Sequence, residues 1–102
     1  MRYKVKLLHA AYTDLREAEK WYKEKGEKLA GDFKTAIHKE INYIAKHPEQ
    51  SPRKYKELRQ SLVKHFPYAI FYLIEKESNR IVILGVLHTR RNPEIIQRRM
   101  KR

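Results

Sequence analysis

Two hydrophobic periods alternate along this chain, and each marks a different kind of segment. Apolar side chains recur every three or four residues in two stretches before His47-Pro48, which predicts two helices joined by a short link at Gly26. The first stripe is Ala11, Leu15, Ala18 and Tyr22, widened by Trp21, and the second is Leu29, Phe33, Ile37, Ile41 and Ile44. Because the link is short, we expect an antiparallel helical hairpin.

Strand patterns flank the helices on both sides. Residues 2–8 alternate basic and apolar side chains, which predicts a short strand at or near the edge of a sheet. Residues 66–74 and 81–88 are rich in β-branched and aromatic residues and enclose a polar turn, so they predict a strong β-hairpin. Residues 54–59 and 61–65 indicate two weaker strand segments before this hairpin.

These elements predict one domain over residues 1–102, of the α+β class, in the order β-α-α-β-β-β. A small antiparallel sheet of three or four strands would carry the helical hairpin on one face. The other face would be open, and because residues 68–74 are apolar on both faces, that open face is a candidate partner surface. Residues 93–102 predict a short C-terminal helix or a tail that orders on binding.

Composition narrows the class of protein. The 102 residues include no cysteine, which excludes disulfides and cysteine-based zinc sites. The five histidines show no paired ligand spacing, so we expect neither a metal nor another cofactor. The first residues lack the apolar run of a signal peptide, and no stretch approaches membrane-spanning length, which favours a cytoplasmic protein without a membrane partner.

Positive charge is concentrated in the second half of the chain. Lys and Arg number 24 against 12 Asp and Glu, a formal net charge of +12. Residues 1–51 contribute +3 and residues 52–102 contribute +9. Such a field attracts polyanions, whether nucleic acid, a ribonucleoprotein or an acidic protein segment. The alternative is that the charge only keeps the protein soluble.

Short motifs follow one another in a fixed order along these elements. They are Asp14-Leu15 and Trp21-Tyr22 in the first helix, Pro48 after the second, Tyr55 with Leu58-Arg59, Phe66-Pro67-Tyr68 with Tyr72, and Val86-Leu87-His88 followed by Arg90-Arg91-Asn92-Pro93. In this order and at these spacings, the chain resembles the RelE/ParE superfamily of toxins from type II toxin-antitoxin modules. The resemblance covers essentially the whole chain.

The resemblance implies two alternative activities. RelE-like members are ribosome-dependent endoribonucleases that cleave mRNA, whereas ParE-like members inhibit DNA gyrase, and an antitoxin that wraps the toxin neutralises both. RelE-like enzymes use basic residues on the central strands and a C-terminal tyrosine, but here Ala69 and Ile96 occupy the positions of an arginine and that tyrosine. The ParE-like branch is therefore favoured, with an mRNA interferase as the alternative. A third possibility is a member that binds its antitoxin and represses their shared promoter but no longer kills.

The resemblance and the charge together indicate candidate site residues. In a ribonuclease, His88, Arg90 and Lys64 are the expected catalytic residues, for proton transfer and for stabilising the phosphate. In a binding toxin, contacts with the target or antitoxin are expected from Arg59, Lys64, His65, Tyr68, Tyr72, His88, Arg90 and Arg91. The expected partners are a cognate antitoxin and either DNA gyrase or the ribosome with its mRNA. The expected assembly is a monomer or an antitoxin-bridged hetero-oligomer.

Overall fold

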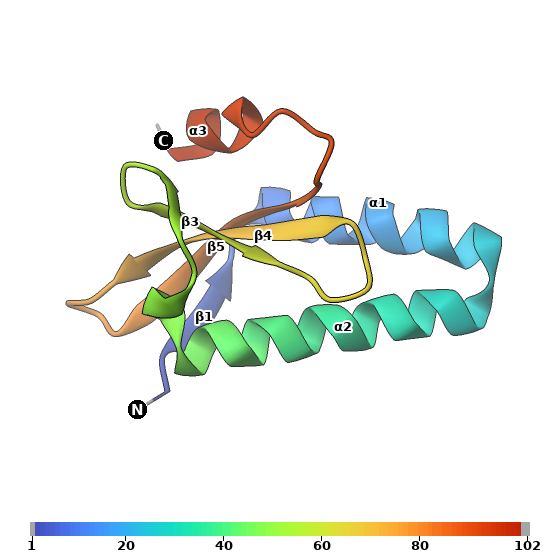
Figure 1. Ribbon diagram of the computed structural model, residues 1–102, viewed down its shortest axis with the longest axis horizontal. Helices are drawn as coiled ribbons and strands as arrows, with labels where there is room; N and C mark the ends of the chain where they lie inside the picture. Colours follow the sequence, from blue (N-terminus) through green and yellow to red (C-terminus); the bar gives the residue numbers. More distant parts are fainter. Residues whose placement is uncertain (1, 101–102) are drawn as a thin grey trace.

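The fold is organised around β5 (Arg80–His88), whose residues from Ile81 to Leu87 are all buried. The computed structural model describes residues 2–100 (Figure 1). The other elements, in chain order, are β1 (Lys4–Leu7), α1 (His9–Lys25), α2 (Glu27–Lys46), the 3₁₀ turn η1 (Pro48–Gln50), β2 (Arg53–Tyr55), β3 (Leu58–Leu62), β4 (Tyr68–Glu75) and α3 (Glu94–Met100). The predicted α+β class is confirmed.

The described residues form a five-stranded sheet in the order β1-β5-β4-β3-β2. The prediction of three or four antiparallel strands was wrong in two respects: the described residues form five strands, and β1 pairs with β5 in parallel. Hydrophobic alternation reports which face of a strand is buried, but it says nothing of the direction of its neighbour. The edge position expected for the first strand is confirmed.

The helical hairpin forms as predicted, with Gly26 as the single residue between α1 and α2. The Gly26 N–H donates to the Tyr22 carbonyl, and the Gly26 carbonyl accepts from the Ala30 N–H, so one residue ends the first helix and begins the second. Figure 1 shows the two helices running antiparallel from this link. Their buried side chains pack on the sheet face that carries Ile70, Tyr72 and Ile83.

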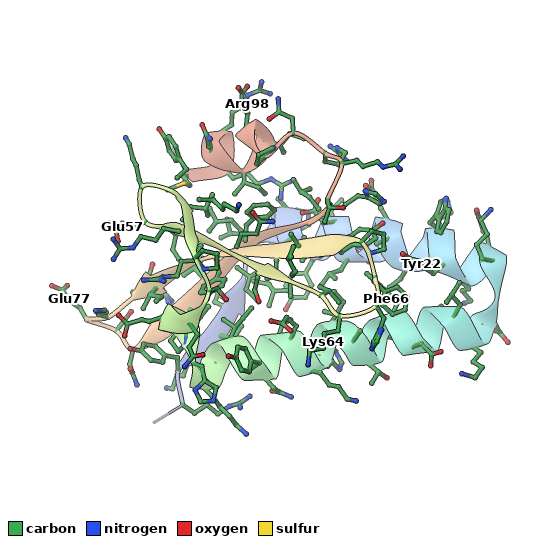
Figure 2. The ribbon with its side chains drawn as sticks, viewed as in Figure 1. Tyr22, Glu57, Lys64, Phe66, Glu77 and Arg98 are labelled. Atoms are coloured by element: carbon green, nitrogen blue, oxygen red, sulfur yellow. The ribbon has the colours of Figure 1, made fainter. Side chains whose placement is uncertain are left out.

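Aromatic rings pack against one another at the end of this core, between the helices and the β3–β4 turn. The Phe33 ring centroid lies 4.9 Å from that of Tyr22 and 5.3 Å from that of Phe66. Tyr22 and Phe66 themselves are 5.2 Å apart, and Figure 2 shows them side by side. Trp21, expected to widen the buried stripe, is instead 52% exposed. Its neighbour Tyr22 already fills the space beneath the helix, so the larger indole lies at the rim.

The second face of the sheet is not open as predicted, because α3 covers it. Ile96 of α3 is fully buried against a second apolar cluster formed by Leu58, Ala69, Phe71, Leu84 and Leu87. The alternation predicted for 68–74 is confirmed, since Tyr68, Ile70, Tyr72 and Ile74 belong to the first core and Ala69, Phe71 and Leu73 to the second. Of the predicted C-terminal helix or tail, residues 94–100 form a helix, and residues 101 and 102 lie outside the described residues.

Candidate functional site

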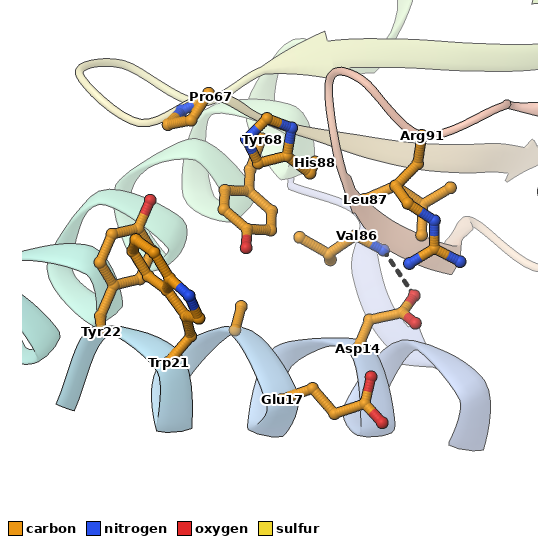
Figure 3. A pocket seen from close by; sticks show the side chains of 11 residues that line it. Asp14, Glu17, Trp21, Tyr22, Pro67, Tyr68, Val86, Leu87, His88 and Arg91 are labelled. Carbon is orange, nitrogen blue, oxygen red and sulfur yellow. Dashed lines mark hydrogen bonds between the residues drawn. The ribbon is translucent and has the colours of Figure 1, made fainter. Parts of the chain in front are cut away.

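A pocket of about 400 Å³ lies between α1 and the ends of β4 and β5 (Figure 3). We call it the strand-end pocket. Its walls are Asp14, Glu17, Ala18, Trp21 and Tyr22 from α1, and Pro67, Tyr68, Val86, Leu87, His88 and Arg91 from the strand side. Three of the predicted site residues, Tyr68, His88 and Arg91, therefore share one pocket.

The pairing of β4 with β5 fixes two of these side chains. Tyr68 and His88 are directly opposite each other in the ladder, and their rings meet edge to face with centroids 5.4 Å apart. The Arg90 N–H donates to His88 Nδ1 at 3.1 Å, and the Arg91 N–H donates to the His88 carbonyl at 2.9 Å. The turn after β5 is thus bonded to His88, and this holds Arg91 at the pocket.

Aromatic residues form one end of the strand-end pocket. The Trp21 ring lies edge to face with Tyr22 at 5.0 Å between centroids, and Tyr22 is 6.1 Å from Tyr68. Burial raises the pKa of Tyr68, and the positive charge of Arg91 partly offsets this increase. Burial also raises the pKa of Tyr22, so both phenols are neutral at physiological pH.

Asp14 at the other end is held by bonds to two distant segments. Its carboxylate pairs with the Arg99 guanidinium of α3 in a bidentate contact of 2.7 and 3.2 Å, and it accepts the Val86 N–H at 2.9 Å. Arg99 also donates to the Leu84 carbonyl at 2.9 Å. Val86 and Leu84 lie on the stretch of β5 beyond the end of β1, where no neighbouring strand pairs with this edge. The side chains of Asp14 and Arg99 therefore bond backbone groups of β5 that would otherwise be unpaired.

Sequence reasoning missed three lining residues of α1: Asp14, Glu17 and Trp21. They are spaced three and four residues apart, so they share one helical face beside the buried stripe. That spacing was the available signal. It was not used because Trp21 was assigned to the buried stripe of the helix.

Lys64 and His65 lie at a different place, the turn between β3 and β4. The expected strand over 61–65 ends at Leu62, and His65 has the left-handed φ of 71°. Both side chains are exposed and line a groove of about 970 Å³ against α2. The exposed apolar residues Leu29, Tyr43 and Leu62 also line this groove. Figure 2 shows Lys64 in this turn, over α2. We call this second hollow the α2 groove.

Tyr72 and Arg59 have structural roles. Tyr72 is fully buried, and its hydroxyl donates to the Pro48 carbonyl at 2.6 Å, so the prediction of a partner contact at Tyr72 was wrong. Its place in the ladder puts the ring on the helix-covered face. The Arg59 guanidinium donates to the Glu49 and Ser51 carbonyls at 3.1 and 2.6 Å, which ties η1 to β3.

The three residues expected to act together in a ribonuclease do not share a site. Lys64 lines the α2 groove, whereas His88 lines the strand-end pocket. Arg90 is exposed beside the pocket. Within residues 2–100, no three His, Asp or Glu side chains gather in a way that could hold a metal ion, and no helix there is long and apolar enough to cross a membrane.

The sequence of this chain matches a known protein family. The family described as "ParE toxin of type II toxin-antitoxin system, parDE" matches residues 5–93. The chain belongs to the ParE toxin family. The match to this ParE family includes α1, α2, all of β2 to β5 and β1 from Val5 onward, and it ends at Pro93, immediately before α3.

Solved structures of related toxins share the ParE-family fold seen here. A chain of the chromosomal ParDE system of P. aeruginosa has a TM-score of 0.74 at 16% identity, over 85% of this chain and 96% of that one. A double mutant of the E. coli toxin RelE in the free state has a TM-score of 0.68 at 14% identity, over 99% and 97%. A chain of the M. tuberculosis RelBE2 complex reaches 0.59 at 17% identity, over 86% and 92%. Comparison with curated proteins gives no match.

Ala69 and Ile96, the two positions of this ParE-family chain at which the resemblance to RelE-like enzymes led us to expect an arginine and a tyrosine, are apolar and fully buried. Ala69 and Ile96 are both 0% exposed and belong to the second apolar cluster, between α3 and the sheet. Neither side chain carries a group that can bind phosphate or transfer a proton. Both positions are therefore filled by packing between α3 and the sheet.

Proposed function

We propose that this ParE-family protein inhibits DNA gyrase by binding it, and that a cognate antitoxin neutralises it. The observation that carries the proposal is the family match over residues 5–93. The ParE-like branch is the one expected to act without chemistry of its own. Binding without chemistry is also what the arrangement of the basic residues favours.

The positions of the basic residues support binding over RNA cleavage. Metal-free cleavage needs a base, an acid and a cation around a single phosphate. In this chain Lys64 and His88 belong to separate hollows, and the RelE-type positions hold Ala69 and Ile96. Arg90 and Arg91 are exposed and suit carboxylates or phosphates on a partner surface.

An antitoxin partner is proposed from the relatives. The P. aeruginosa relative belongs to a ParDE toxin-antitoxin system, and the M. tuberculosis relative is a toxin-antitoxin complex. The α2 groove combines exposed apolar residues with two lysines, Lys39 and Lys64, and two carboxylates, Asp32 and Glu40, which suits an amphipathic segment whose apolar side packs in the groove.

A supercoiling assay with purified gyrase tests the proposed target. We expect the folded protein to inhibit supercoiling and the co-purified antitoxin to restore it. The double variant Arg90→Ala/Arg91→Ala should inhibit less, whereas Arg53→Ala, which removes an exposed arginine from the far edge of the sheet, should inhibit as the wild type does. Supercoiling that proceeds normally in the presence of folded protein sinks the proposal.

Mapping RNA 5′ ends shortly after induction in a bacterial host separates the two branches. Intact messages with a strong DNA-damage response support gyrase inhibition. New ends at defined positions within codons would instead indicate an mRNA interferase, and Arg90, His88 and Lys64 would then be tested as its catalytic residues. Harmless overexpression of folded protein would favour the third possibility, a member that only binds its antitoxin.

A further inference from the structure

The strand-end pocket has an aromatic end and a charged end. Figure 3 shows Trp21 and Tyr22 on one side, Asp14, Glu17 and Arg91 on the other, and the Tyr68 hydroxyl pointing into the space between them. Trp21 is 52% exposed although it lies beside buried rings. A ligand that fits such a pocket has a flat apolar part and a polar part that can meet both a carboxylate and an arginine.

Some polar groups at the charged end already form hydrogen bonds or ion pairs within the protein, and others do not. Asp14 is neutralised by Arg99 and bonded to the Val86 N–H. Within residues 2–100, the side chains of Glu17, Arg90 and Arg91 form no hydrogen bond or ion pair with one another or with any other group. Two adjacent cations and one carboxylate are therefore available to a ligand.

We propose that the strand-end pocket binds a nucleotide of a single-stranded nucleic acid, with the base against Trp21 and its phosphate at Arg91 and Arg90. Aromatic rings that stack on bases beside cations that contact phosphates are the common basis of single-strand binding. The volume, about 400 Å³, is that of a small-ligand pocket. The net charge of +12 attracts a nucleic acid strand to the protein.

Glu17 is an exposed hydrogen-bond acceptor inside the pocket. It repels a phosphate and an acidic side chain alike, but the amino group of a base can donate a hydrogen bond to it, and the phenyl ring of a peptide carries no such donor. The pocket also differs in place from a RelE-type site. It lies between α1 and the strand ends, while Ala69 lies on the opposite face, beneath α3.

The chain supplies its own probe, because Trp21 is its only tryptophan. Trp21 emission is recorded while the protein is titrated with a short single-stranded RNA, a DNA of the same sequence, the corresponding DNA duplex, and an acidic peptide that contains one phenylalanine. We expect saturable quenching by a single strand and weaker quenching by the duplex; comparing the RNA and DNA arms identifies the strand preferred. Quenching by the peptide alone, or by none of the four, overturns the proposal.

Matched variants separate stacking from general attraction to a polyanion. With a labelled strand, Trp21→Ala should weaken binding about tenfold or more, whereas Tyr12→Ala, which removes an equally exposed ring from the same helix, should leave it within about twofold. Arg91→Gln should lower the slope of log affinity against log salt by about one, and Arg53→Gln should not. Equal losses in each matched pair would overturn the proposal. Gyrase inhibition is measured independently, so failure here leaves the proposed function standing.

Discussion

At the scale of single residues, Asp14 is expected to stabilise the fold through its pair with Arg99. Asp14→Asn keeps the shape of the side chain but removes the partner of Arg99, whose side chain is only 21% exposed. Because the remaining cation is partly buried, we expect the free energy of unfolding to fall by about 2 kcal/mol. Urea denaturation measures the change. The control is Asp32→Asn, since Asp32 pairs with Lys28 on the exposed surface of α2 and should cost less than about 0.5 kcal/mol.

Tyr72 is expected to matter for stability and not for binding. Tyr72→Phe leaves the Pro48 carbonyl without its buried donor, which should cost about 1 to 2 kcal/mol. The control is Tyr43→Phe, because the Tyr43 hydroxyl bonds to Gln50 on the surface and its loss should cost less than about 0.5 kcal/mol. Gyrase inhibition by folded Tyr72→Phe should equal that of the wild type. A folded variant that fails to inhibit would restore Tyr72 as a partner contact.

Alkaline pH should destabilise the fold through its buried phenols. Burial raises the pKa of Tyr22, Tyr68 and Tyr72 above the ordinary value of 10.0. The unfolded chain therefore loses these protons first, and the free energy of unfolding falls as pH rises from about 10 toward the folded pKa values. Urea denaturation at several pH values above about 9 measures this decline. Tyr72→Phe should make it shallower; an unchanged slope would mean that Tyr72 does not contribute.

At the scale of elements, the position of α3 depends on a glycine in β5. A Cβ at Gly85 would clash with Arg99 Nη1 and Ile96 Cδ1, so Gly85→Ala requires these two α3 side chains to move, and we expect α3 to pack less closely on the sheet. We expect a loss of about 1 to 3 kcal/mol and faster amide exchange in residues 94–100. Gly31→Ala is the matched control, because nothing lies within 4 Å of its Cβ and alanine should stabilise α2 by about 0.5 to 1 kcal/mol. Unchanged exchange in α3 would contradict the expectation.

Elements with a strong local period were predictable, and those defined by distant contacts were not. The helices and the 68–88 hairpin follow from the spacing of their apolar residues. The turns at Lys56 and His65 were missed because their left-handed φ values, 51° and 71°, occur at residues that carry no turn signal. The docking of α3 depends on Asp14 and Arg99, which lie 85 residues apart, so no sequence spacing reveals it.

The candidate site was predictable only in part for the same reason. Basic and aromatic residues at strand ends were identified, and three of them do line one pocket. Sequence alone could not divide the remaining residues between the strand-end pocket, the α2 groove and the core. That division depends on the register of β3, β4 and β5, which brings Tyr68 to His88 and buries Tyr72.

At the scale of the whole molecule, charge repulsion should make stability depend on salt. The net charge is +12, yet residues 2–100 form five ion pairs, most of them exposed. Salt screens repulsion between the unpaired cations more than it weakens these few pairs. We expect Tm to rise by a few degrees between about 0.05 and about 0.5 M NaCl. Lys54→Glu should reduce the rise by lowering the net charge, and a Tm that falls with added salt would contradict this balance.

The place of β5 in the chain has a consequence for protein synthesis. This strand is the neighbour of both β1 and β4, yet it is the last strand to be translated. Until residue 88 has left the ribosome, β1 has no strand to pair with, and the helical hairpin has only part of the sheet to cover. The nascent chain therefore completes this sheet only after β5 has been translated, and until then its N-terminal strand and helices lack the strand on which they pack.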